Sequence, residues 1–203
     1  MKYILLCFCL LSLLGCGTET KTQQDAKPTT TANEQAKTNQ SQDSHIIAAK
    51  QALSSGDYNK AIEEATTAIK ANANNAEAYS IRGFATALNG DTAKGLVDTK
   101  KAYDLDPNNV ANYYNMAMVY KLQGQLQESK QWFEKVLEKD PSNTWSVYGI
   151  ATIYADQGYD TKALDWLEKA IKIDPSVKAV AAEQDHFERF HNNERFKQLV
   201  ESK

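Results

Sequence analysis

Apolar residues recur along most of this chain at the spacing of an α-helix, and turns interrupt the pattern at regular intervals. Residues 55–75, SGDYNKAIEEATTAIKANANN, begin with a Gly-Asp turn, continue with alanines and isoleucines three or four positions apart, and end in a polar run. This spacing gathers the apolar side chains on one face of a helix and leaves the other face to solvent. The stretch therefore predicts an amphipathic helix bounded by two turns.

The same pattern occurs four times, at a constant distance of 34 residues. The glycine of each turn can adopt the left-handed conformation that ends a helix. These glycines are Gly56, Gly90, Gly124 and Gly158. In the last three copies an Asp-Pro pair follows, and proline cannot continue a helix. The prolines are Pro107, Pro141 and Pro175. A constant period without insertions predicts an array of two-helix units.

Small residues mark the predicted contact between the two helices of a unit. Gly83 stands opposite Gly95, for example, and Ala117 opposite Ser129. The repeat resembles the tetratricopeptide repeat, whose pattern of a small residue, a tyrosine, an alanine, an aromatic residue and a proline is matched best by YNMAMVYKLQGQLQESKQWFEKVLEKDP. The resemblance implies an all-α, tetratricopeptide-repeat solenoid of four helix-turn-helix units, at residues 42–75, 76–109, 110–143 and 144–177.

The four predicted units differ in the side chains that bridge their two helices. Unit three has Tyr120 with Phe133 at these positions, and unit four has a tyrosine with a leucine. Units one and two have only an Ala-Ala pair and a Thr-Thr pair there. Because the stability of a repeat array is a sum of local contributions, we expect units one and two to bury less apolar surface and to open more easily.

Arg82 occupies a position where the resembled family usually has a core leucine. Similar repeats with Arg-Gly here carry an aspartate in the second helix, and Asp98 stands at that position. A buried charge needs a partner, so the resemblance implies an ion pair between Arg82 and Asp98. The alternative is that the Arg82 side chain extends to solvent.

The N-terminal residues resemble a bacterial lipoprotein signal. One lysine precedes an apolar run at residues 3–14, which is too short to span a bilayer, and the run ends in LLGC. The motif implies a signal peptide at residues 1–15 and a diacylglycerol on Cys16, whereas the alternative is an ordinary signal followed by an unrelated cysteine. Residues 16–41 are rich in Thr, Gln, Asn and Lys and are predicted to form a disordered tether. This interpretation places the protein outside the cytoplasm, on the outer face of the cytoplasmic membrane or, in a cell with two membranes, on the outer membrane.

The C-terminal residues 178–203 depart from the repeat. Phe187 with Phe190, and Phe196 with Leu199, fall at helical spacing and predict an apolar face over a polar one. Since an array needs an atypical last unit to cover its exposed core, this segment is predicted to be a helical cap.

The sequence contains no convincing catalytic, metal or cofactor site. Glu183, Asp185, His186 and His191 lie close in the sequence, but their spacing matches no metal motif. No phosphate-binding glycine loop or nucleophile-base arrangement can be named. Without the signal, 22 basic residues stand against 26 acidic ones and do not cluster, which argues against nucleic acid as a partner. We expect a protein that is not an enzyme and has no cofactor.

The resemblance implies that the first helix of each unit lines a concave surface. The residues of this chain at those positions form an aromatic and apolar stripe that is predicted to bind a partner. They include Phe84, Leu88, Tyr114, Met118, Trp145 and Tyr148. Exposed apolar surface of this kind marks interaction sites, although some of these side chains could instead pack against a neighbouring unit or the cap.

These observations favour a membrane-anchored adaptor or scaffold in the cell envelope, which would bind an extended or helical segment of another protein in its groove. The first alternative is a structural protein that self-associates through the same stripe, as a homodimer for example. The second alternative is an enzyme or a solute carrier with a pocket closed by the cap, for which no residue of the sequence gives support.

Overall fold

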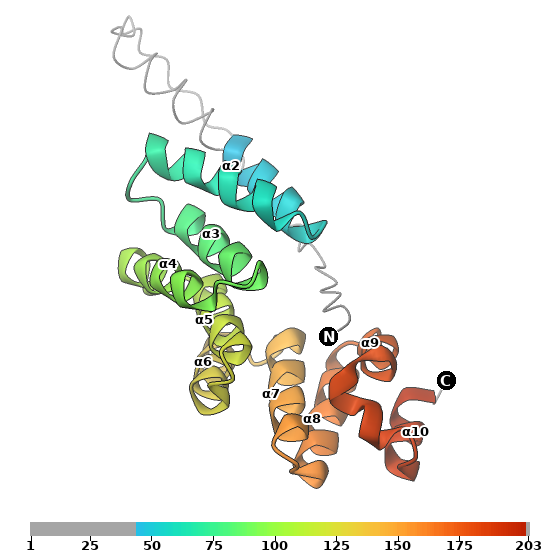
Figure 1. Ribbon diagram of the computed structural model, residues 1–203. Coiled ribbons are helices and arrows are strands. Elements are labelled where there is room, and N and C mark those ends of the chain that lie inside the picture. The colour runs from blue at the N-terminus through green and yellow to red at the C-terminus, as the bar shows by residue number, and fades with distance from the viewer. Residues whose placement is uncertain (1–43, 202–203) are drawn as a thin grey trace, which may run out of the picture.

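The computed structural model describes residues 44–201, and over this range the chain is helical and contains no strand. The first helix occupies residues 44–54 of the described range. The repeats continue with α2 (Tyr58–Ala71), α3 (Ala76–Leu88), α4 (Thr92–Leu105), α5 (Val110–Leu122), α6 (Leu126–Lys139), α7 (Thr144–Asp156) and α8 (Asp160–Ile173). The last elements are α9 (Val177–Glu183), the 3-10 helix η1 (Asp185–Phe190) and α10 (Glu194–Glu201). Figure 1 shows these helices following one another from one end of the molecule to the other, which confirms the predicted all-α solenoid.

The predicted signal peptide, Cys16 and the tether at residues 16–41 lie outside the described residues. Among the helices of residues 44–201, none combines the length and the apolar composition that are needed to cross a bilayer.

Turn glycines lie at helix ends, as the sequence predicts, and polar side chains cap helix starts. Each of the four turn glycines has a positive φ, for example 78° at Gly56 and 74° at Gly124. Asn75 precedes α3, and its side chain accepts a hydrogen bond from the Ala78 amide. Asn143 caps α7 in the same way, by accepting from the Ser146 amide. Such caps satisfy amide groups that would otherwise lack a partner at a helix start.

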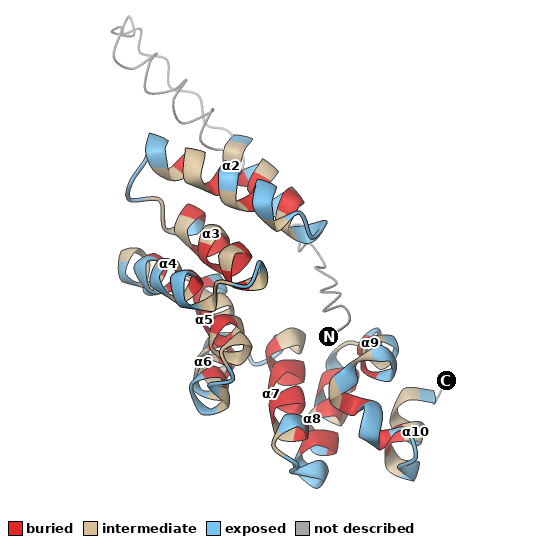
Figure 2. Ribbon diagram, viewed as in Figure 1, coloured by how far each residue is buried: buried red, intermediate tan, exposed pale blue. Residues whose placement is uncertain are grey.

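The two helices of unit two approach so closely that only glycine fits between them. A Cβ atom on Gly83 would lie 2.7 Å from the carbonyl oxygen of Gly95, and one on Gly95 would lie 2.6 Å from the carbonyl oxygen of Gly83. A second close contact joins units three and four, where the Phe133 ring of α6 rests on Gly149 of α7. Figure 2 shows the buried faces of neighbouring helices meeting in this way, with the exposed residues on the outer faces.

Large buried side chains are distributed unevenly along the array. Among the largest fully buried side chains of the described residues, only Phe84 lies in units one and two. Units three and four contribute Phe133, Met116, Ile150, Ile153, Leu167, Val119, Val136 and Val177. The core of the first two units consists mainly of alanines, which bury little apolar area per residue.

The ion pair that the sequence predicts in unit two is present. Arg82 Nε donates to Asp98 Oδ2 over 2.6 Å, and Nη2 donates to Oδ1 over 2.8 Å. The two side chains are 24% and 16% exposed, and the guanidinium also lies 5.4 Å from the centre of the Tyr79 ring. The hydrogen bonds to Asp98 hold the pKa of Arg82 above its usual value. Arg82 is therefore paired inside the array and does not extend to solvent.

The last elements cover the apolar face of unit four. Phe187, Phe190 and Phe196 are almost completely buried in one cluster with residues of α7 and α8. The rings of Phe187 and Phe196 stack with centroids 5.8 Å apart. In Figure 1 this C-terminal segment lies directly beside α8, at the end of the array. The core of unit four is consequently completed by residues that do not belong to a repeat.

Candidate partner-binding surface

Two residues of the predicted binding stripe are buried, and the expectation that they are exposed to a partner is wrong. Phe84 is 0% exposed and packs with Val119, which belongs to the next unit. Tyr148 is 8% exposed, and its ring lies 5.9 Å from that of Phe187 in the C-terminal segment. The positions were predicted from the resemblance to the tetratricopeptide repeat, whereas their burial is decided by the neighbouring unit and by the cap.

The other four predicted residues remain partly exposed. They form what we call the first-helix patch, which consists of Leu88, Tyr114, Met118 and Trp145. These side chains come from α3, α5 and α7, the first helices of three successive units. Their inner sides contribute to the core clusters, so the patch is a shallow apolar surface on packed side chains.

Tyr114 illustrates how the patch is held in place. Its ring meets the edge of the Phe133 ring with centroids 5.7 Å apart. Burial raises the pKa of its hydroxyl above the usual value, because ionisation would place a charge in an apolar environment. The contact with Phe133 positions the Tyr114 ring within the patch.

A polar cluster joins the first helices to the C-terminal segment. Lys121 Nζ of α5 donates to Thr152 Oγ1 of α7 over 2.5 Å and lies 3.2 Å from His186 Nε2 of η1. His186 Nδ1 lies 2.6 Å from Asp156 Oδ1, at the end of α7. Burial lowers the pKa of Lys121 to about 8, although the nearby Asp156 carboxylate acts in the opposite direction. The cluster holds η1 against two units of the array.

Sequence reasoning did not find this cluster. Lys121 and His186 are 65 residues apart, and His186 lies in a segment without repeat register, so no spacing rule relates them. Within residues 44–201, no group of three or more His, Cys, Asp or Glu side chains is placed to hold a metal ion.

Comparison with known families identifies the repeat. Models of the tetratricopeptide repeat match residues 48–110, 111–143 and 146–177, and together they span most of the described chain. The chain belongs to the tetratricopeptide-repeat family. No curated protein sequence matches this tetratricopeptide-repeat protein significantly.

Solved structures with the same fold have low sequence identity to the chain. MamA from Desulfovibrio magneticus RS-1 is 19% identical with a TM-score of 0.60, and the match covers 79% of this chain and 90% of that one. YrrB, described as a TPR protein with an unusual peptide-binding site, is 17% identical with a TM-score of 0.56, covering 85% of this chain and 88% of that one. The O-GlcNAc transferase of Thermobaculum terrenum is 17% identical with a TM-score of 0.62, covering 66% of this chain and 26% of that one. At these identities the likeness shows the fold alone.

Proposed function

We propose that this protein is a membrane-tethered adaptor that binds a segment of another protein on its first-helix patch. The observation that carries the proposal is the patch itself, in which Leu88, Tyr114, Met118 and Trp145 stay partly exposed although the array around them is packed. Partly exposed aromatic and Met side chains on a rigid helical surface are typical of interface cores. Membership of the tetratricopeptide-repeat family and the similar fold of YrrB, a protein with a peptide-binding site, support this reading.

The chemistry of the patch indicates what kind of segment it binds. One position of the first helix, repeated every 34 residues, holds Ile46 in unit one, Ser80 in unit two and Tyr114 in unit three. None of these residues is cationic. A terminal carboxylate would find no charged partner at these positions. We therefore propose that an internal, apolar segment binds there through side-chain contacts.

Anchoring is the second part of the proposal, and it is supported by the LLGC motif at the end of the N-terminal apolar run. A diacylglycerol on Cys16 would keep the array close to the membrane, since two acyl chains suffice for stable attachment. Cells grown with radiolabelled palmitate should yield a labelled protein in the membrane fraction. Substitution Cys16→Ser should remove the label and release the protein, and a membrane-bound, labelled variant would contradict the anchor.

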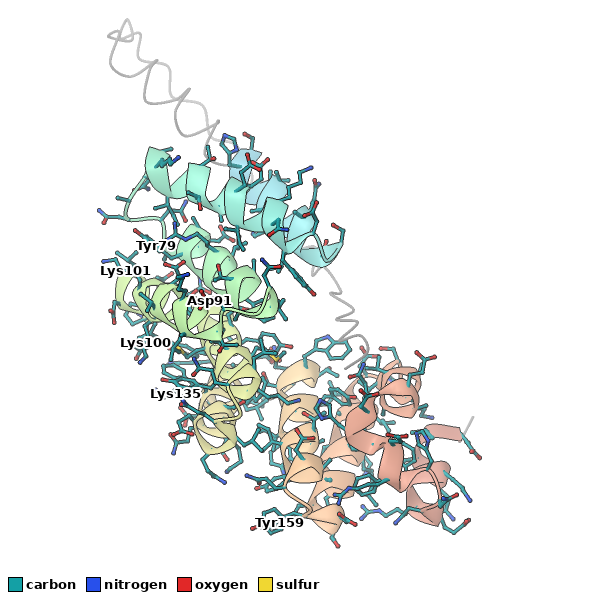
Figure 3. The ribbon with its side chains drawn as sticks, in the orientation of Figure 1. Tyr79, Asp91, Lys100, Lys101, Lys135 and Tyr159 are labelled. Carbon is teal, nitrogen blue, oxygen red and sulfur yellow. The ribbon has the colours of Figure 1, made fainter. Side chains whose placement is uncertain are left out.

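Photo-crosslinking in the source cells tests the patch. A benzoylphenylalanine residue is placed at Met118 or at Trp145, and a control is placed at Lys101, which is exposed on the outer edge of α4 (Figure 3). We expect both patch positions to give an adduct with the same protein and the control position to give none. A polar substitution in the patch, Leu88→Gln, should weaken the adduct at Met118.

The remaining outcomes are informative as well. The same adduct at all three positions, or no adduct at the two patch positions, would exclude the patch as the binding surface. An adduct of twice the mass of the chain would favour self-association over an adaptor role.

A further inference from the structure

The junction between units two and three is filled by an aromatic cluster on the side of the second helices. The ring of Tyr103 lies 5.1 Å from that of Trp132, and the ring of Tyr113 lies 6.0 Å from both. Lys135 Nζ lies 3.9 Å from the centre of the Trp132 ring. The Tyr113 hydroxyl donates to the carbonyl oxygen of Pro107 over 2.5 Å. In Figure 3 the labelled Lys135 lies at the outer edge of this junction.

The next junction repeats half of this cluster and leaves the other half open. One period later, Pro141, Trp166 and Lys169 stand where the filled junction has Pro107, Trp132 and Lys135. The two tyrosines, however, are replaced by Leu137 and Val147, which are shorter. A cleft of about 390 Å³ remains at this place, and it is lined by Leu137, Pro141, Val147, Trp166, Lys169, Lys172 and Ile173.

In unit two, other side chains occupy the positions that correspond to this cleft. There, Asp98 stands at the position of the tryptophan, and it pairs with Arg82, whose guanidinium lies over the Tyr79 ring. An internal ion pair and a tyrosine thus occupy the equivalent region. The cleft between units three and four lies at Val147, where units two and three have Tyr79 and Tyr113.

We propose that this cleft binds a tyrosine side chain within an acidic segment of a partner protein. The bound ring would occupy the space that Tyr103 and Tyr113 fill at the previous junction, and would contact Trp166 as those rings contact Trp132. Its hydroxyl would donate to the Pro141 carbonyl, as Tyr113 donates to the Pro107 carbonyl. Ile173, which is 40% exposed, forms an apolar lip of the cleft.

The charges at the rim select the residues next to the tyrosine. Lys169 Nζ lies 4.3 Å from the centre of the Trp166 ring, and Lys172 is 72% exposed and pairs with Glu168 over 2.8 Å. Because the Lys172 charge is paired with Glu168, the ammonium group of Lys169 is the one that would attract a carboxylate of the partner. An acidic residue next to the tyrosine would meet this group. No residue of the first-helix patch lines the cleft, so this site is independent of the proposed function.

The three tryptophans of the chain allow the site to be tested by NMR. In ¹⁵N-labelled protein, the indole N–H signal of Trp166 reports on the cleft, that of Trp132 on the filled junction, and that of Trp145 on the first-helix patch. Single Trp→Phe variants assign the three signals. The probe is a blocked pentapeptide with one tyrosine between two pairs of glutamates, and the control peptide carries alanine in place of the tyrosine.

We expect the tyrosine peptide to shift the Trp166 signal in a saturable manner, while the Trp132 and Trp145 signals stay in place. The control peptide should leave all three signals unchanged. The double substitution Leu137→Tyr with Val147→Tyr rebuilds the filled cluster and should abolish the shift. The substitution Lys169→Glu changes an exposed residue and should weaken binding by about two- to fivefold.

Several results would overturn the proposal. The first is a Trp166 signal that does not move at millimolar peptide, and the second is an equal shift with the alanine peptide. The third is a shift that stays undiminished both in the Leu137→Tyr, Val147→Tyr variant and in the Lys169→Glu variant. A shift of Trp145 in place of Trp166 would also overturn it, and would assign the peptide to the first-helix patch. Failure of the cross-linking at Met118 and Trp145, by contrast, would leave the cleft unaffected.

Discussion

Arg82 is a charged residue that the array accommodates inside unit two. Its guanidinium forms two hydrogen bonds with Asp98, and both side chains are mostly buried. If one member of such a pair is removed, the other stays buried as an unpaired charge. The resulting loss of stability is larger than the net contribution of the pair to stability. The stability of unit two should therefore depend on keeping both residues or on replacing both.

Substitution Asp98→Ala should lower the free energy of unfolding by about 1–3 kcal/mol. The additional change Arg82→Leu should recover much of this loss, because it removes the unpaired charge. Lys50→Ala is a matched control, since Lys50 pairs with Glu77 at a site where the side chains are 53% and 48% exposed, and it should cost at most about 0.5 kcal/mol. Urea unfolding measures all three, and equal losses for Asp98→Ala and Lys50→Ala would show that the buried pair has no special role.

Lys121 should make stability depend on pH in the alkaline range. Burial lowers its pKa from the usual 10.5 to about 8, so between these values the unfolded chain binds more protons than the folded chain. Stability associated with this group therefore rises as the pH rises from about 8 to 10.5. Below that pH range Lys121 is charged in the folded protein, and burial of this ammonium group beside Asp156 and His186 lowers the stability.

The substitution Lys121→Met should remove this dependence. The stability of the variant minus that of the unchanged protein should fall by about 1–3 kcal/mol between pH 7.5 and pH 10, as urea unfolding can measure. Lys101→Met, which changes an exposed lysine of α4, should give a constant difference over the same range. A constant difference for Lys121→Met as well would mean that the pKa of Lys121 is not lowered.

At the scale of single residues, the sequence predicted what lies within one unit. Arg82 and Asp98 are 16 residues apart in the same repeat, and the resemblance to the tetratricopeptide repeat implied their ion pair. The burial of Tyr148 and the contact between Lys121 and His186 both depend on the C-terminal segment. That segment has no register with the repeats, and its packing could not be derived from their period.

At the scale of helices, the period also predicted where turns occur and which helices pair. The closest pair, α3 with α4, depends on Gly83 and Gly95, because each would place a Cβ atom within 2.7 Å of the other's carbonyl oxygen. Backbone atoms cannot move aside as a flexible side chain can. The separation of these two helices is therefore set by the absence of a methyl group at Gly83.

Substitution Gly83→Ala separates two opposing effects. Helix propensity alone would stabilise the protein by about 1 kcal/mol, since alanine is the better helix former. The contact with the backbone of α4 should outweigh this gain and lower the free energy of unfolding by about 1–3 kcal/mol. Thermal or urea unfolding decides the sign, and a variant that is as stable as the unchanged protein would show that α3 and α4 can move apart freely.

At the scale of the whole molecule, stability should be graded along the array. The chain packs mainly alanines between the helices of the first two units, and phenylalanine, leucine and isoleucine between those of the last two. Each additional buried methylene contributes about 0.8 kcal/mol, and each unit contacts mainly its neighbours. The C-terminal segment adds three buried phenylalanines at the side of unit four. We therefore expect the end of the array farther from the proposed anchor, which holds the cleft at Trp166, to be the more rigid one.

Amide hydrogen exchange under native conditions tests this gradient. We expect faster exchange in residues 44–109 than in residues 110–177, because local opening of the first two units exposes less apolar surface. The decisive comparison is α3 and α4 against α5 and α6, since both pairs are internal and fraying of the array ends does not affect them. Substitution Phe133→Leu removes part of the largest side chain between α5 and α6, and should bring their exchange closer to that of α3 and α4. Faster exchange in residues 110–177 would show instead that the glycine contact and the Arg82 ion pair of unit two outweigh the larger core of unit three.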